Sequence, residues 1–195
     1  MNWKSVFFIA AVAFGAYQHQ TSRPVKPPAG VLAAEVPRQV GTRQAAFDFN
    51  GFRVTPLHDF SIQARVLGVE AYRFDREASL SPVDLALGWG PMSDSEVLQH
   101  IDISQSGRFY FWRGKDLPVP QRDIERSSAN MHMIPADKAI ERRLKSVREG
   151  QVVRIEGWLV EARSPDGFFW RSSLTRDDTG AGACELIFVK NLQVL

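Results

Sequence analysis

The sequence predicts an α+β fold, built around a mainly antiparallel sheet with three short helices. Six segments have the alternation or the β-branched and aromatic content of strands, and three carry helix signals. The regular strand–helix repeat of a doubly wound sheet is missing from the pattern. A long first strand interrupted by Gly68, with a hairpin later in the chain, is also compatible with a small, partly open barrel of the OB type.

Length and composition favour one domain of ordinary size. The chain has 195 residues, of which 44% are hydrophobic, enough for one sizeable core. Lys and Arg number 24 against 22 Asp and Glu, and the sequence shows no basic stripe, so we expect no nucleic-acid partner. The single cysteine, Cys184, lies in an apolar run and is expected to be buried.

Residues 1–17 are typical of an export signal or an N-terminal membrane anchor. Val6–Tyr17 is uncharged and apolar. Its twelve residues suit a signal-peptide core better than a spanning helix, which needs about 17–25 residues. An uncleaved anchor is the alternative, because no clean Ala-x-Ala site follows and Trp3 and Tyr17 flank the run as interfacial aromatics do. We expect the residues after this run to lie on the extracytoplasmic side of a membrane, either anchored to it or secreted.

Residues 18–44 are predicted to be an extended linker. Prolines and glycines are frequent there and large apolar side chains are few. This places the single folded domain at residues 45–195.

The domain opens with a strand and two helix signals. Phe60–Phe74 alternates as a half-buried strand does, with a bend or bulge expected at Gly68. Ser81 precedes a proline, and an acidic residue follows in the first turn, so a short helix is predicted over Pro82–Leu87. A second helix, capped by Ser93 or Asp94, is expected to run to position 101.

Aromatic and amphipathic segments fill the middle of the domain. Arg108–Arg113 predicts an aromatic strand and Asn130–Ile134 a short one, with a polar surface loop over Gly114–Ser128 between them. Ala136–Val147 has apolar residues at helical spacing and predicts an amphipathic helix.

The last third of the chain has the pattern of β-strands. Gln151–Ala162 alternates, Ser164–Gly167 is a turn signal, and a hairpin returns through Phe168–Thr175. After a second loop at Arg176–Ala181, the segment Ala183–Leu195 closes the sheet.

A first candidate for chemistry is Met131-His132-Met133. Thioether and imidazole groups suit copper, but neighbouring residues of a strand point to opposite faces, so the three side chains cannot converge. We therefore predict neither a metal nor a cofactor from this motif.

A second candidate combines His132 with the carboxylates of Asp177, Asp178 and Glu185. Such a set could hold a hard cation or act as a general acid and base, which gives the alternative of a metal-assisted hydrolase or metal-handling protein. The same Asp-Asp-Thr-Gly letters are also those of a tight hairpin turn.

Aromatic side chains provide a third candidate, a ligand surface formed by Trp89, Trp112 and Arg176. Trp89 stands between two glycines, where it could face a partner or fill the core. The core position is the favoured one.

Three motifs carry a resemblance: Ser-Pro-Val-Asp-Leu-Ala-Leu-Gly-Trp-Gly-Pro-Met-Ser-Asp at 81–94, Asn-Met-His-Met-Ile-Pro-Ala at 130–136, and 173–180 with 182–185. With them the chain resembles a family of bacterial cell-envelope proteins that have an apolar N-terminus, a Pro-rich linker and one globular domain. The resemblance implies an envelope location, at the inner membrane facing the periplasm or secreted to the periplasm, and it carries over no catalytic residue. The expected function is therefore a non-enzymatic module, attached to the membrane through its N-terminal segment, that binds an envelope protein or polymer.

Overall fold

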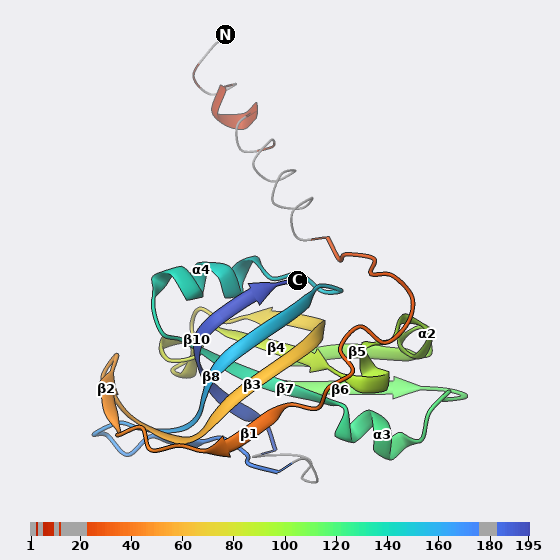
Figure 1. Ribbon diagram of the computed structural model, residues 1–195. Helices are drawn as coiled ribbons and strands as arrows, with labels where there is room; N and C mark the ends of the chain where they lie inside the picture. Colours follow the sequence, from red (N-terminus) through yellow and green to blue (C-terminus); the bar gives the residue numbers. More distant parts are fainter. Residues whose placement is uncertain (1–2, 4–5, 10–11, 13–22, 176–182) are drawn as a thin grey trace.

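The computed structural model describes residues 3, 6–9, 12, 23–175 and 183–195 (Figure 1). The elements in chain order are β1 (Arg38–Gly41), β2 (Phe47–Phe49), β3 (Phe52–Ala71), the 3-10 helix η1 (Glu77–Ser79), β4 (Val83–Gly88), the 3-10 helix η2 (Gly90–Ser93), α2 (Ser95–Leu98), β5 (Ile101–Ser106), β6 (Phe109–Gly114), α3 (Gln121–Arg126), β7 (Ser128–Pro135), α4 (Lys138–Ser146), β8 (Val152–Arg163), β9 (Phe169–Arg171) and β10 (Glu185–Val194).

The main sheet is organised around the long strand β3. It pairs antiparallel with β4 on one side and with β8 on the other. β4 continues to β7, and β10 joins β7 in parallel and β8 in antiparallel orientation. The α+β class with a mainly antiparallel sheet is thus confirmed, with β7 and β10 as the parallel exception. The hairpin β5–β6 forms a separate two-stranded sheet.

The main core lies between these five strands. Alternate residues of β3, β4, β7, β8 and β10 point into one buried apolar cluster. Helix α4 covers one end of the cluster with Ile140 and Leu144, and Asp137 caps it by accepting hydrogen bonds from two backbone amides. The predicted amphipathic helix is therefore confirmed, two residues shorter at its start than the pattern suggested.

Strand β3 is longer than predicted and irregular in two places. It begins at Phe52, eight residues before the alternating segment, because β2 and the far end of β8 extend its pairing. Its register with β4 shifts between Val66 and Gly68, which confirms the expected bulge. A second shift, between Pro56 and His58, faces β8.

The predicted helix over Pro82–Leu87 is wrong, because these residues form strand β4. All six residues of β4 are buried, and a strand buried on both faces lacks the alternation that identifies half-buried strands. Ser81 donates its hydroxyl hydrogen bond to the Met133 carbonyl at 3.1 Å and caps no helix. Asp84, expected in the first turn of that helix, is instead buried within the sheet.

The second predicted helix is shorter than expected. Only α2 is helical, capped by the Asp94 carboxylate, which accepts from the Glu96 amide at 2.9 Å. Ile101 leaves the helix because it pairs with Gly114 in the β5–β6 hairpin. The predicted surface loop after that hairpin contains a further helix, α3, anchored by the buried Ile124.

Much of the predicted linker belongs to the domain. Strand β1 pairs with β3, and Ala33 is buried in the main core. The Val25 amide donates to the Glu149 carbonyl at 2.8 Å, and the Gly90 amide donates to the Ala33 carbonyl at 2.7 Å. These bonds use the backbone, which the side-chain composition does not reveal, so the described part of the domain starts about twenty residues before position 45.

Two further findings concern the described residues nearer the chain ends. Among the described residues, no helix has the length and apolar content needed to cross a membrane. Cys184, expected to be buried, is partly exposed, because it precedes the first residue of β10.

Candidate functional site

The two predicted ligand-contacting tryptophans lie in different parts of the structure. Trp89 is 2% exposed and packs in the main core, in agreement with the core interpretation. Trp112 is half-buried and packs under the β5–β6 hairpin against a separate cluster that includes Met92 and Ile124. They therefore share no ligand surface. Arg176, the third member of that set, lies outside the described residues.

The predicted histidine–carboxylate set is only partly described, since Asp177 and Asp178 lie outside the described residues. In the parallel register of β7 and β10, Glu185 pairs with Met131, and Leu186 pairs with His132. Because paired residues share a face of a sheet and successive residues along a strand point to opposite faces, His132 and Glu185 point to opposite faces. Within residues 23–175 and 183–195, no three His, Cys, Asp or Glu side chains gather as a metal site would require.

His132 instead meets a carboxylate that the sequence interpretation had placed on a helix. Its Nδ1 atom lies 2.9 Å from Oδ1 of Asp84, and both side chains are almost completely buried. The orientation of the ring falls outside hydrogen-bond geometry, so the two atoms are in close contact without a hydrogen bond. Asn130 completes this side of Asp84 by donating to Oδ2 at 3.4 Å.

Arg108 reaches the same carboxylate from the turn of the hairpin. Its Nη1 atom lies 3.1 Å from Asp84 Oδ1 and donates to the Ser81 carbonyl at 2.8 Å, while Nη2 lies 2.8 Å from Asp75. Its backbone adopts a left-handed conformation, with φ at 73°, which residues other than glycine rarely take. The ion pairs of Arg108 with Asp84 and Asp75 thus hold this turn in its left-handed conformation.

Aromatic rings enclose the guanidinium of Arg108. The Cζ atom lies 3.6 Å from the centroid of the Tyr72 ring and 5.6 Å from that of Trp170, and the Trp170 ring centroid is 4.6 Å from that of His132. Burial, with the charge of Asp84 nearby, raises the pKa of Tyr72 to about 12. The cluster is closed: His132 is 3% exposed, which leaves little room for a substrate, and it joins the hairpin to the sheet.

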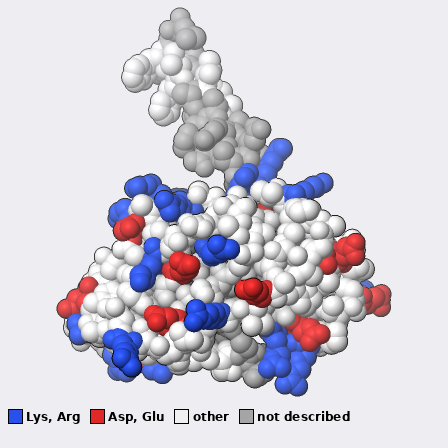
Figure 2. All heavy atoms as spheres, in the orientation of Figure 1, with Lys and Arg blue, Asp and Glu red and all other residues white. Residues whose placement is uncertain are grey.

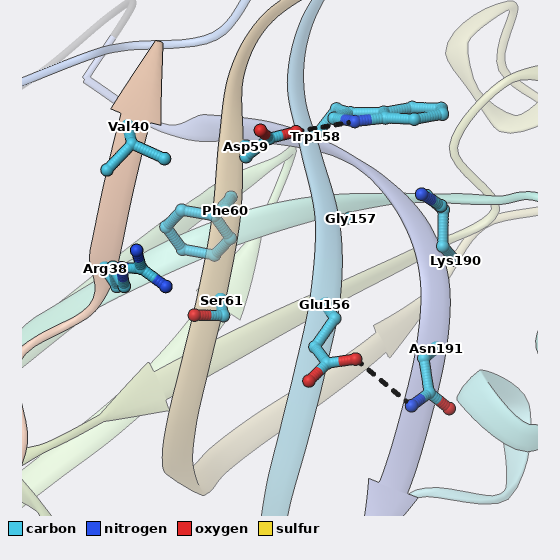
Figure 3. Close-up of a pocket in the computed structure, with 10 residues that line it drawn as sticks. All are labelled: Arg38, Val40, Asp59, Phe60, Ser61, Glu156, Gly157, Trp158, Lys190 and Asn191. Carbon is cyan, nitrogen blue, oxygen red and sulfur yellow. Dashed lines mark hydrogen bonds between the residues drawn. The ribbon is translucent and has the colours of Figure 1, made fainter. Parts of the chain in front are cut away.

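An open groove lies elsewhere, on the outer face of four adjacent strands (Figure 3). Its volume is about 440 Å³, and none of its lining residues belongs to the His132 cluster. The lining comes from β1, β3, β8 and β10 and consists of Arg38, Val40, Asp59, Phe60, Ser61, Glu156, Gly157, Trp158, Lys190 and Asn191.

One end of the groove is formed by the indole of Trp158. Its Nε1 donates to Asp59 Oδ1 at 2.9 Å, and its ring stacks on Phe188 with centroids 5.6 Å apart. Lys190 Nζ lies 4.1 Å from the centroid of the indole. The indole is therefore fixed from several sides, as a preorganised contact surface requires.

The other end is polar. Asn191 donates to Glu156 at 3.3 Å, and Figure 3 shows both side chains on the groove side of β8 and β10. A second groove of about 320 Å³ adjoins it and shares Ser61 and Glu156 as lining residues. Together the two grooves form a longer trough along β3 and β8.

The sequence interpretation missed this site because its residues are far apart in the chain. The available signal was the outward-facing half of two predicted strands, which contains Ser61, Glu156 and Trp158, while Asp59 directly precedes the first of these strands. Asp84 carried a different signal, a single acidic residue inside an apolar run.

Comparisons of this chain with protein-family models, with curated protein sequences and with solved structures found no match.

Proposed function

We propose that the chain is a membrane-tethered binding module of the bacterial cell envelope, with its domain on the periplasmic side. The open groove across β1, β3, β8 and β10 is the observation that carries the proposal, because it combines a fixed indole with several hydrogen-bonding side chains. The uncharged run Val6–Tyr17 supports the tether, and the resemblance of three motifs to envelope proteins supports the location.

We further propose that the domain is a partly open barrel of the OB type. Its five main strands pair in the order β3–β4–β7–β10–β8, and β8 pairs again with β3. The chain passes from β7 through α4 to β8, which places β10 between them in the manner of a Greek key. OB-type domains bind ligands on the face of their second and third strands. In this chain those are β4 and β7, whose outer face carries the closed His132–Asp84–Arg108 cluster, so the groove on the other strands is the available surface.

The ligand that fits the groove is an extended and uncharged or weakly charged polar polymer. The trough is elongated, because its lining runs from Asp59 to Gln63 along β3 and from Trp158 to Arg154 along β8. Its charged side chains alternate in sign, with Arg38 and Lys190 against Asp59 and Glu156, so a ligand of high net charge gains little there. An indole face beside carboxylate and amide groups suits a chain rich in hydroxyl and amide groups, such as a cell-wall glycan.

The test is co-sedimentation of the full chain, in mild detergent, with purified peptidoglycan sacculi. Ser61 lies in the middle of the trough between Arg38 and Glu156, and Ser61→Arg fills it. Ser104→Arg is the matched control, because Ser104 is an exposed serine on strand β5, outside the groove. We expect Ser61→Arg to weaken binding more than about tenfold, equal to about 1.4 kcal/mol, and Ser104→Arg to leave it unchanged. Equal binding by both variants, or no binding by the wild type, would refute the groove as a glycan site.

A further inference from the structure

The described segment that begins at residue 23 contacts the domain beside the end of helix α4. The Val25 amide donates to the Glu149 carbonyl at 2.8 Å, three residues after α4 ends. At Gly150 a side-chain carbon would lie only 1.9 Å from the Val25 carbonyl oxygen, so the two backbones are in tight contact. In Figure 1 the dark orange segment that follows residue 22 begins on the side of the domain where α4 lies.

This side of the domain is basic. The segments 23–26 and 137–149 contain seven Lys and Arg residues and three acidic ones. Figure 2 shows Lys and Arg side chains along this edge, with fewer acidic side chains between them. The basic residues are Arg23, Lys26, Lys138, Arg142, Arg143, Lys145 and Arg148.

Internal ion pairs neutralise only part of this charge. Lys138 and Lys145 both bond to Glu141 and hold the pKa of its carboxyl below its ordinary value, so this group of three keeps a single net positive charge. Arg142 and Arg143 are exposed, and neither forms an ion pair with a residue in the described part of the chain. Cations near a helix C-terminus also stabilise the helix by interacting with its dipole. This alternative role for the basic residues of α4 does not depend on the surroundings of the domain.

We propose that α4 and the chain around Val25 form a docking surface for anionic phospholipid headgroups. The inference rests on the proposed tether, which brings this side of the domain to the bilayer. If the apolar run ends in the membrane at Tyr17, Val25 follows eight positions later, a span of at most about 28 Å. Docking on anionic lipid then sets the orientation of the domain and holds the groove at a defined height above the membrane.

The experiment places a fluorophore on the full chain and a nitroxide quencher on the lipid headgroups. The probe is attached at Ser146→Cys, at the exposed end of α4, or at Ser104→Cys on the hairpin, in a Cys184→Ser background. Vesicles contain phosphatidylcholine alone or with phosphatidylglycerol. We expect strong quenching at position 146 only with phosphatidylglycerol, decreasing in high salt, and weak quenching at position 104.

Charge reversal supplies the decisive comparison. Each basic side chain near an anionic surface contributes roughly fivefold to binding, so Arg142→Glu with Arg143→Glu should weaken docking more than about tenfold. Arg113→Glu with Lys115→Glu, exposed on and after β6, is the matched control and should leave quenching unchanged. A role confined to the helix dipole predicts no dependence on lipid charge.

Retention of the chain by vesicles in an alkaline wash reports the tether separately. A retained chain whose quenching at position 146 ignores lipid charge overturns the docking surface and leaves the tether standing. A chain lost in the wash but quenched at position 146 by anionic vesicles at neutral pH supports the surface without the tether. Loss in the wash together with no charge-dependent quenching overturns both.

Discussion

His132 and Asp84 are cross-strand partners in the antiparallel pair of β7 and β4, and Nδ1 of His132 lies 2.9 Å from Oδ1 of Asp84 inside the structure. The same carboxylate is also 3.1 Å from the guanidinium of Arg108, on a hairpin that forms no backbone ladder with the main sheet. One buried carboxylate therefore joins two separate sheets through side chains.

Removing that charge should destabilise the fold. We expect Asp84→Asn to lower the free energy of unfolding by about 3 kcal/mol, near the lower end of the range for breaking a buried ion pair, because Arg108 keeps its contact with Asp75. Urea unfolding followed by tryptophan fluorescence measures the change. Asp48→Asn, which breaks an exposed pair with Arg53, should cost less than about 1 kcal/mol. Equal costs for the two variants would show that the buried cluster does not stabilise the fold.

Trp89 should act as a core residue and not as a ligand contact. Trp89→Ala removes a side chain that is 2% exposed and should cost about 3–5 kcal/mol of unfolding free energy. Trp112→Ala, at a half-buried position, should cost less. Denaturant midpoints of the two variants decide the order, and a smaller loss at Trp89 would contradict its place in the core.

A comparison of Gly150 with Gly167 separates the energetic cost of a left-handed backbone from the cost of disturbing the contact with Val25. Gly150 and Gly167 have φ of +87° and +91°, but only Gly150 has a neighbour where a side-chain carbon would stand. We expect Gly167→Ala to cost about 1–2 kcal/mol and Gly150→Ala to cost more. Hydrogen exchange of the Val25 amide should also accelerate in Gly150→Ala alone. If exchange stays slow there, Val25 is held by something other than this contact.

Stability should decrease at high pH because the fold favours neutral phenols. Burial raises the pKa of Tyr110 from 10.0 to about 12, as burial and Asp84 do for Tyr72. The folded state therefore retains protons that the unfolded chain loses, so this contribution is complete below about pH 10 and disappears toward about pH 12. Unfolding free energies measured across this range test it. Tyr110→Phe should flatten the decrease, and an identical slope in that variant would exclude Tyr110 as a source.

Regular patterns explain which elements the sequence predicts well. β3, β8 and α4 each bury one face, so alternation or helical spacing identifies them. β4 is buried on both faces and therefore shows no alternation. The Ser81-Pro82 pair before it and Asp84 within it indicated the start of a helix instead, and pairing in the sheet overrides that local preference. Strand β1 was missed because it is held by backbone pairing with β3, which leaves no trace in its polar side chains.

The site is less predictable than the elements, because strand pairing assembles it. His132 was recognised as unusual, but its partner Asp84 is 48 positions earlier and became a neighbour only when β4 and β7 paired. The groove likewise brings Asp59 to Trp158, 99 positions apart. Side-chain type and spacing give no measure of such distances until the pairing of the strands is known.

The central position of β3 also determines how the chain must fold. Its first half pairs with the last residues of β8, so that Val54 lies opposite Ala162, and its second half pairs with β4. A protein dominated by such distant contacts folds slowly, because long loops must close before the contacts are gained. Synthesis adds β8 and β10 last, so a nascent chain cannot complete its core until its final forty or so residues have emerged. A C-terminal truncation before β10 should therefore yield an unfolded chain instead of a smaller folded one.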